Sequence, residues 1–327
     1  MKKFNLFLLL IGLLTLVLAA CGSNSDENTS EEPAADGGGS EETSETYTVE
    51  HAMGTAEIKG TPEKVVILTN EGTEALLSMG VTPVGAVQSW TGDPWYDHIS
   101  DQMEGVEVVG TESEVNVEAI AALKPDLIIG TKLRQEAVYE QLNQIAPTVM
   151  SETLKGDWKE NFALYAEALN KSEEGEQVIS EFDQRVEELS GALEEGGHLE
   201  KEISMVRFLA GDTRIYHKDS FSGIILDQLG FARPEEQDID DFAEDGVTKE
   251  RVGAMEGDVL FYFTYETGDG EGNATEEDWL NDPLFQNLEV VKAGNVQEVS
   301  DTIWNTAGGV LAANVMLDDI ESYFLSE

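Results

Sequence analysis

The chain has 327 residues, with 19 Lys or Arg against 66 Asp or Glu, and its formal net charge at pH 7 is −47. Such a negative balance excludes nucleic acid as a partner, because binding it requires a surface that displaces counterions from phosphates. The hydrophobic share of 41% and the five Trp exclude a wholly disordered chain. The length predicts two domains or one large body with two lobes.

The first 20 residues predict a secretory signal peptide. Lys2 and Lys3 precede an apolar run from Phe4 to Ala20, and small residues close the run. The run is also close to the shortest length that spans a bilayer, so an uncleaved transmembrane anchor is the alternative. The string Leu18-Ala19-Ala20-Cys21-Gly22 resembles the lipobox of bacterial lipoproteins. That resemblance implies that Cys21 becomes the mature N-terminus and carries a diacylglycerol.

Residues 22–46 form a polar segment that contains neither Lys nor Arg. Because such a segment buries too little apolar area to fold, we predict a disordered acidic tether over residues 21–46 and a folded body from Tyr47 onward. Residues 51–327 still hold 17 Lys or Arg against 57 Asp or Glu. The folded surface itself is therefore acidic, which indicates saline or alkaline surroundings in which solvated carboxylates keep a protein soluble.

Short apolar strands alternate with helices over residues 47–156, the predicted first lobe. Asn116 is expected to cap a helix that Pro125 ends, and Glu118 lies in its first turn, where a negative charge suits the helix dipole. Alternation with short loops predicts a parallel sheet with helices on both faces. The predicted strands begin at residues 65, 84, 106, 126 and 147, and the predicted helices span 74–80, 116–124 and 136–145.

The alternation stops at residues 157–195, where apolar side chains recur at spacings of three and four. This pattern predicts a connecting helix, and Asn170 to Ser172 resemble a cap at which it could break. The predicted fold class is α/β, with two Rossmann-like lobes joined by a single long helix. The alternation resumes over residues 196–327, the predicted second lobe, with strands at 203–209, 259–263 and 296–299 and helices at 222–229, 249–255 and 307–324.

Several strings resemble the siderophore-type substrate-binding lipoproteins of iron-siderophore and cobalamin ABC importers. They are residues 53–66 (MGTAEIKGTPEKVV), residues 76–85 (LLSMGVTPVG) and residues 116–129, which contain NVEAI and LKPDLII. The resemblance implies the class III periplasmic-binding-protein architecture. It implies a protein without catalytic residues that captures a ferric siderophore and delivers it to an ABC permease dimer with its cytoplasmic ATPase. It also implies a monomer at the extracellular face of a Gram-positive type of cell membrane, held by its lipid anchor.

Strings in both lobes resemble receptors for citrate-based carboxylate siderophores such as staphyloferrin B; they cover residues 88–90, 132–134, 144–148, 206–208, 213–216 and 303–309. This resemblance implies a carboxylate siderophore as the ligand. The alternatives are the same scaffold with a hydroxamate or catecholate siderophore, haem or cobalamin, and a surface enzyme that acts on envelope material. The enzyme alternative lacks support, because the four His are scattered and neither a Gly-x-Ser-x-Gly nor a phosphate-loop motif occurs.

We expect no cofactor and no metal ion that the protein itself ligates. The single Cys excludes an internal disulfide and a cysteine-based metal cluster. The resemblance implies that ferric iron is bound only through the siderophore, which fills the coordination sphere of the metal.

Arginines are the first candidate ligand contacts, because an Arg fork pairs bidentately with carboxylate and a ferric citrate-type chelate is anionic. Arg134 follows the end of a predicted strand, where ligands bind in open α/β sheets. Arg207 and Arg214 flank the opening strand and turn of the second lobe. The alternative is that these Arg only pair with nearby carboxylates, and Asp212 is such a neighbour of Arg214.

Other candidate contacts follow from position and resemblance. Lys132 adds a point charge beside Arg134, and Asn70 and Thr73 follow the first predicted strand and are expected to face the cleft. Core packing is the alternative role for two of the three aromatic candidates, Trp90 and Tyr216. The residues expected to line the cleft with flat walls, or to lie at its mouth, are Trp90, Tyr216, Trp304 and Asn305.

Glu71 departs from the resemblance. It also follows the first predicted strand and is expected to face the cleft, where the relatives carry neutral residues. An added carboxylate disfavours an anionic ligand, so Glu71 bears on which siderophore is bound.

Glu118 and Glu250 each lie at a predicted helix start, one in each lobe. The resemblance implies that Glu at these positions dock with Arg residues of the permease dimer. Like charges on both lobes suit two symmetric basic pockets. The alternative is an ordinary charge in a first helical turn, which stabilises the helix by only about 0.3–1 kcal/mol.

Overall fold

The computed structural model describes residues 45–154, 156 and 158–326. The predicted signal peptide at 1–20, the predicted lipidation site Cys21 and all but the last two residues of the predicted tether at 21–46 lie outside the described residues. None of the described helices combines the length and the apolarity that a membrane crossing requires.

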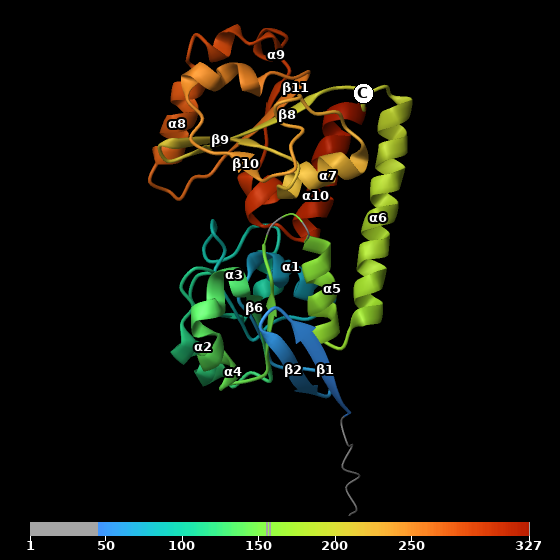
Figure 1. Ribbon diagram of the computed structural model, residues 1–327, viewed down its shortest axis with the longest axis vertical. Helices are drawn as coiled ribbons and strands as arrows, with labels where there is room; N and C mark the ends of the chain where they lie inside the picture. The colour runs from blue at the N-terminus through green and yellow to red at the C-terminus, as the bar shows by residue number, and fades with distance from the viewer. Residues whose placement is uncertain (1–44, 155, 157, 327) are drawn as a thin grey trace, which may run out of the picture. The chain divides into compact units, whose positions relative to one another are not determined.

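The first lobe is built on a parallel sheet of five strands in the order β5-β4-β3-β6-β7, preceded by an antiparallel hairpin of β1 and β2 (Figure 1). Every residue of β3 and β6 is buried, as expected for parallel strands with helices on both faces. The strands are β1 (Thr46–His51), β2 (Gly54–Lys59), β3 (Val65–Ile67), β4 (Gly85–Ala86), β5 (Glu107–Val108), β6 (Leu127–Thr131) and β7 (Thr148–Ser151). The helices are α1 (Asn70–Ser78), α2 (Val117–Leu123), α3 (Lys132–Gln135) and α4 (Tyr139–Asn143), with 3₁₀ turns at Ser100–Met103 and Glu136–Val138.

The second lobe carries a mixed sheet of five strands in the order β10-β9-β8-β11-β12. Strands β8, β11 and β12 are parallel, whereas β9 lies antiparallel to both of its neighbours, β8 and β10, which the strand–helix alternation did not predict. Gly211, with φ of 66°, lets the chain turn back after β8, so β8 and β9 form a hairpin. The elements are β8 (Ile203–Leu209), β9 (Asp212–Tyr216), β10 (Ala243–Glu244), β11 (Val259–Thr264), β12 (Val296–Glu298), α7 (Phe221–Leu229), α8 (Glu271–Leu280), α9 (Glu289–Lys292) and α10 (Val310–Leu325), with 3₁₀ turns at Lys249–Met255 and Phe285–Asn287.

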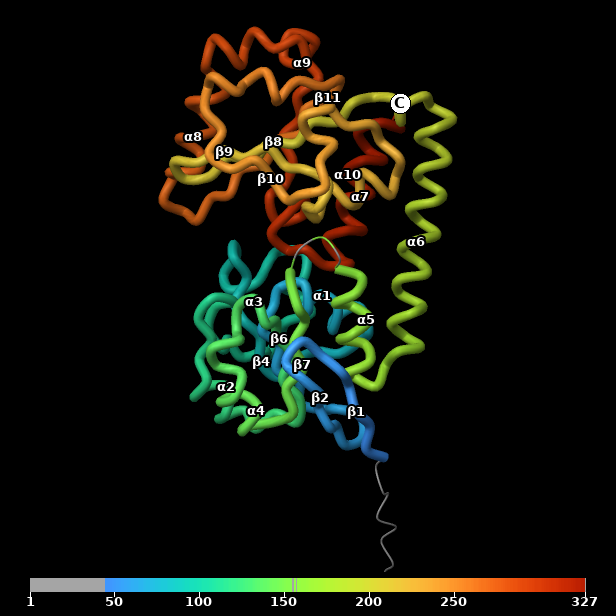
Figure 2. Tube along the Cα trace, in the orientation of Figure 1, coloured from blue at the N-terminus to red at the C-terminus, as the bar shows by residue number. Residues whose placement is uncertain are grey.

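The segment predicted to connect the lobes, residues 157–195, contains two helices, α5 (Trp158–Ala168) and α6 (Ser172–Glu195). Asn170 adopts a left-handed conformation with φ of 55°, which ends α5, so the helical stretch breaks where the cap pattern allowed it. Helix α5 packs against α1 of the first lobe. Helix α6 runs beside both lobes (Figure 2), and it packs against α5, α7 and α10.

Glu74 of α1 fastens the two lobes together. One oxygen of its fully buried carboxylate accepts a hydrogen bond of 2.9 Å from the backbone N–H of Ala312 in the first turn of α10. The other oxygen lies 2.6 Å from Nε2 of His98. Gly309 is required beside them, because a Cβ atom there would come within 2.6 Å of the Glu74 carboxylate. The carboxylate thus caps a helix of the other lobe, which makes a direct polar contact between the two lobes.

Candidate ligand-binding cleft

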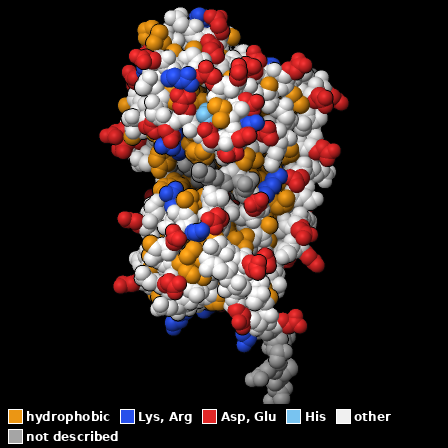
Figure 3. Space-filling view, in the orientation of Figure 1, with side chains coloured by type: hydrophobic (Ala, Val, Ile, Leu, Met, Phe, Trp, Pro, Cys, Tyr) orange, Lys and Arg blue, Asp and Glu red, His pale blue; other side chains and the backbone are white. Residues whose placement is uncertain are grey.

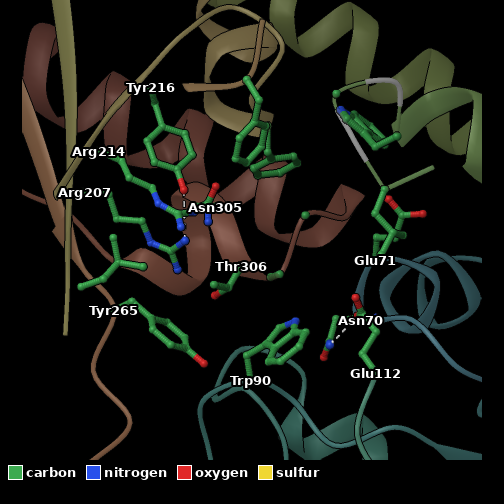
Figure 4. Close-up of a pocket in the computed structure, with 18 of the residues that line it drawn as sticks. Asn70, Glu71, Trp90, Glu112, Arg207, Arg214, Tyr216, Tyr265, Asn305 and Thr306 are labelled. Carbon is green, nitrogen blue, oxygen red and sulfur yellow. Dashed lines mark hydrogen bonds between the residues drawn. The ribbon is translucent and has the colours of Figure 1, made fainter. Parts of the chain in front are cut away.

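A cavity of about 390 Å³ lies between the two lobes. Helix α3 begins directly after β6, and α1 begins at Asn70, shortly after the end of β3 at Ile67, so their first residues stand at the carboxyl edge of the sheet, where ligands bind in this fold class. The second lobe contributes the π-helical turn Thr302–Thr306, a geometry that is frequent at functional sites. Figure 4 shows Arg207, Arg214, Tyr216 and Tyr265 on one side of the cavity and Asn70, Glu71, Trp90 and Glu112 on the other.

Arg134 lies in the cavity wall, as the sequence predicted. Its side chain is 41% exposed, and its guanidinium carbon stands 5.9 Å from the centroid of the Trp90 ring. Its Nε is 3.8 Å from Oε1 of Glu112, which is too long for a hydrogen bond. Within the described chain, the Arg134 guanidinium therefore keeps its donors for a ligand while a cation–π contact orients it.

Arg207 also lies in the cavity wall. It is held there by Asp301, a partner that the sequence did not predict. Its Nε and Nη2 donate to the two oxygens of Asp301 at 2.6 and 3.1 Å, and its Nη1 donates to the hydroxyl of Tyr216 at 3.0 Å. Burial opposes the charge, yet Tyr216 and Asp301 outweigh burial and raise the pKa of Arg207. Arg207 is thus a fixed cation, stacked 4.9 Å from the ring centre of Tyr265.

Arg214 fits both interpretations of its role. Its side chain lies in the cavity wall and is 30% exposed. Its Nε also pairs with Asp212 at 3.1 Å and with Asp245 at 2.9 Å. Two carboxylates on one guanidinium offset most of the attraction that Arg214 could exert on an anionic ligand.

Trp90, Tyr216 and Asn305 line the cavity as predicted. Trp90 is half-buried. Tyr216 combines the two roles considered for it, because its ring packs 5.2 Å from Phe242 and 5.5 Å from Phe263 while its hydroxyl meets Arg207 in the wall. Asn305 belongs to the π-helical turn.

Trp304, Lys132 and Thr73 do not line the cavity, so the prediction that they do is wrong. Trp304 is fully buried in the core and its Nε1 donates to Asp319 at 2.9 Å, because the π-helical turn points it away from Asn305. Lys132 turns to Glu152 at 2.7 Å. Thr73 lies on the inner face of α1, where its hydroxyl donates to the carbonyl of Thr69.

Glu71 lies in the wall and is only 9% exposed. Its Oε1 accepts hydrogen bonds of 2.8 Å from Nδ2 of Asn161 and from the hydroxyl of Tyr165, both in α5. Burial raises its pKa to about 8 against the lowering effect of these two hydrogen bonds, and the charges of Glu112 and Glu74 add to the rise. The raised pKa favours the protonated form of Glu71, which lessens the repulsion expected from an added carboxylate.

Glu112 is the main wall residue that sequence reasoning missed. Its Oε2 accepts hydrogen bonds from the backbone N–H of Asn70 at 3.0 Å and from Asn70 Nδ2 at 2.9 Å. Gln135 donates to the backbone carbonyl of Glu112 at 2.7 Å and accepts from the backbone N–H of Thr131, which ties this loop to the start of α3. Burial raises the pKa of Glu112, while Asn70 and Arg134 oppose the rise. No local periodicity marks such a loop residue, so the sequence carried no signal for it.

Comparison with known proteins identifies the architecture. The model of the periplasmic binding protein family matches residues 65–302. The chain belongs to the periplasmic binding protein family. The Bacillus subtilis protein named "Probable siderophore-binding lipoprotein YfiY" is 51% identical over 99% of each chain. The Fe(3+)-citrate-binding protein YfmC of the same organism is 28% identical over 95% of this chain and 96% of its own.

A solved structure agrees with the fold. The crystal structure of Staphylococcus aureus SirA complexed with staphyloferrin B is 35% identical, with a TM-score of 0.79 over 85% of this chain and 98% of that one. The predicted α/β class, the class III architecture and the predicted family are confirmed. The periplasmic binding protein described here is not an enzyme, so the enzyme alternative is wrong.

Glu118 and Glu250, the predicted docking residues, are both exposed on the binding protein. Glu118 lies in the first turn of α2, which Asn116 caps by accepting from the N–H of Ala119. Glu250 lies in the first turn of the 3₁₀ segment Lys249–Met255 rather than in an α-helix. In residues 45–154, 156 and 158–326 neither Glu forms an ion pair, so both carboxylates are available to a partner.

The described part of the chain contains no cluster of side chains that could ligate a metal ion directly. There, no group of three or more His, Cys, Asp or Glu comes close enough together to hold a metal ion.

Proposed function

We propose that this binding protein captures a ferric siderophore of the citrate-based carboxylate class outside the membrane and delivers it to an ABC import permease. The observation that carries the proposal is the gathering of cations in the cleft, since three of the six Arg line one cavity. Asp and Glu side chains are spread over the visible face of the body (Figure 3), whereas the lining of the cavity holds three Arg against two carboxyl groups, those of Glu71 and Glu112. Exposed charges act over a Debye length of about 8 Å, so the Arg in the cleft can attract an anionic ligand although the protein as a whole is negative.

The relatives support the ligand class. The name of YfmC specifies Fe(3+)-citrate, and SirA was crystallised with staphyloferrin B. Arg forks pair with the carboxylates that such chelates present. The iron stays inside its siderophore, so the binding protein requires no cofactor and no metal ligands of its own.

Anchoring and assembly form a second part of the proposal. Cys21 carries the lipid, residues 21–46 act as the tether, and the mature monomer stands at the extracellular face of a Gram-positive type of cell membrane. Its partner is a permease dimer driven by a cytoplasmic ATPase. The lipobox string and the lipoprotein name of YfiY support this arrangement. Cys21→Ser is expected to release the protein from the membrane fraction, and retention there would contradict the lipid anchor.

Tryptophan fluorescence tests the ligand, because Trp90 and Trp158 line the cavity and report on its occupancy. The titration uses ferric staphyloferrin B, ferric citrate, a ferric hydroxamate, a ferric catecholate, haem and cobalamin. We expect saturable binding of the carboxylate chelates. A response only to an uncharged hydroxamate chelate would refute the carboxylate assignment.

That hydroxamate chelate is the second candidate ligand, and a specific observation favours it. Arg207 and Arg214 are already paired with carboxylates, so the positive charge that the cleft offers is smaller than three guanidinium groups suggest. The binding of a chelate with a lower negative charge depends less on the attraction of these Arg, so their pairing with carboxylates weakens it less.

Permease docking is tested by charge reversal. Glu118→Lys and Glu250→Lys are expected to block siderophore uptake by cells and to leave chelate affinity intact, because both residues lie outside the cavity. Glu114→Lys, at another exposed position of the first lobe, is the matched control and should leave uptake unchanged. Loss of chelate binding in either docking variant would contradict the docking role.

A further inference from the structure

Glu71 occupies a place where the binding surface, the connecting segment and the second lobe meet. It is the second residue of α1, and its carboxyl faces Asn161 and Tyr165 of α5. The glycine turn before α10 comes very close, since a Cβ atom at Gly309 would lie 3.0 Å from the backbone oxygen of Glu71. A negative charge on this carboxyl would therefore lie close to α5, to the turn before α10 and to a ligand in the cavity.

The surroundings of Glu71 favour the neutral acid. Within the described chain no Lys, Arg or His pairs with it, and its two donors both meet Oε1. The charges of Glu112 and Glu74 oppose a negative charge on Glu71, and burial raises the pKa of its hydrogen-bond donor Tyr165 well above the ordinary value. His98 is committed to Glu74, and Arg134 stands beside Glu112. A buried carboxylate without a cation is strongly disfavoured, so these surroundings favour the protonated form of Glu71.

We propose that Glu71 is a residue of the cleft wall that stays protonated while the binding protein holds an anionic ferric chelate and weakens that binding once it ionises. This inference rests on the proposed function, because it takes an anionic chelate as the ligand. In the neutral form, Glu71 adds no charge to the wall that faces the chelate. In the ionised form, it places a third carboxylate beside Glu112 and Glu74, in a region of low dielectric where like charges repel strongly. Its pKa of about 8 puts the change in the alkaline range.

The test compares the full-length protein with Glu71→Gln, which keeps the shape and hydrogen bonding of a protonated Glu but cannot ionise. The dissociation constant for ferric staphyloferrin B is measured by Trp fluorescence at about pH 6.5 and about pH 9.5, on either side of the change. Any titration of the chelate itself is the same for both proteins and cancels in their ratio. Glu114→Gln removes an exposed carboxylate outside the cavity and serves as the matched control.

We expect the wild-type protein and Glu114→Gln to lose about tenfold more affinity between the two pH values than Glu71→Gln loses. Equal pH profiles for the wild-type protein and Glu71→Gln would overturn the inference and leave the proposed function standing. Absence of binding by all three proteins at both pH values would overturn the proposed function and the inference with it.

Unfolding of the ligand-free proteins gives a readout that needs no siderophore. Native Glu71 keeps its proton up to a pKa of about 8, whereas the unfolded chain loses it near the ordinary value of 4.5. The stability of the wild-type protein relative to Glu71→Gln should therefore be highest below pH 4.5 and fall as the pH rises to about 8. A difference that does not change with pH would show that Glu71 is not held as an acid, and would overturn the inference.

Discussion

The two walls of the cleft hold their cations in opposite ways. On the second lobe, Arg207 is 6% exposed and locked to Asp301 and Tyr216, and Arg214 is paired with two carboxylates. On the first lobe, Arg134 is 41% exposed and stands 3.8 Å from Glu112, with no hydrogen bond to the described chain. The second lobe thus presents a preorganised surface whose charges are mostly offset, while the first lobe presents a cation that is free to respond. This difference predicts that Arg134 contributes most to the binding of an anion.

The largest effect that we expect is a loss of stability when the second-lobe wall loses Asp301, the carboxylate that holds Arg207. Asp301→Ala leaves Arg207 buried without its partner, which should lower the free energy of unfolding by about 3–5 kcal/mol. Asp245→Ala removes an exposed partner of Arg214 and should cost only about 0–1 kcal/mol. Urea unfolding of both variants measures the contrast. Similar losses of unfolding free energy in the two variants would contradict the distinction between the buried, paired Arg207 and the more exposed Arg214.

In the first-lobe wall, removal of Arg134 should lower the affinity for the ligand and leave the stability of the protein almost unchanged. Arg134→Ala is expected to weaken binding of ferric staphyloferrin B about 10- to 100-fold, since a charge-assisted hydrogen bond contributes about 1.5–3 kcal/mol. The unfolding free energy should hardly change, because the side chain is half exposed and makes no hydrogen bond within the described chain. Arg251→Ala, an exposed Arg outside the cavity, is the control. Equal affinities for Arg134→Ala and Arg251→Ala would refute the assignment of Arg134.

The aromatic support of Arg134 should have a smaller effect on affinity. Trp90→Ala removes a cation–π contact worth about 0.5–1 kcal/mol, so we expect affinity to fall about two- to fivefold. Trp304→Phe provides the contrast, because Trp304 packs 4.7 Å from Phe261 in the core and lies outside the cavity. That variant should lower the melting temperature and leave affinity unchanged. An affinity loss on Trp304→Phe with none on Trp90→Ala would reverse the two assignments.

The smallest effect concerns the rim of the first lobe. Lys132 pairs with Glu152 and does not line the cavity. Lys132→Ala should therefore change chelate affinity by less than about twofold, because exposed ion pairs are weak and screened. Isothermal titration in low and in moderate salt measures the change. A loss comparable to that of Arg134→Ala would mean that Lys132 swings into the cleft when ligand binds.

Secondary structure was predictable where periodicity was strong. The strands that begin near residues 65, 126, 203 and 259 are buried apolar runs, and the structure has β3, β6, β8 and β11 there. The N-cap at Asn116 follows from its local chemistry and is present. Strands β9 and β10 were not predicted, since β9 belongs to an antiparallel hairpin and β10 is an edge strand of only two residues, and neither carries the continuous apolar run of the buried parallel strands. The break between α5 and α6 was visible as a cap pattern, but the packing of α5 on α1 was not.

The sequence by itself determined the acidity of the body, the α/β class, the family resemblance and the small number of Arg that could meet an anion. Each of these depends on composition or on local spacing. Only the tertiary structure decided how those Arg are held, that Glu71 and Glu112 are buried in the wall, and that Trp304 belongs to the core. The partners that decide these states are distant in sequence, such as Asp301 for Arg207 and Tyr165 for Glu71. Burial and charge pairing arise from contacts between such segments, and no local pattern encodes them.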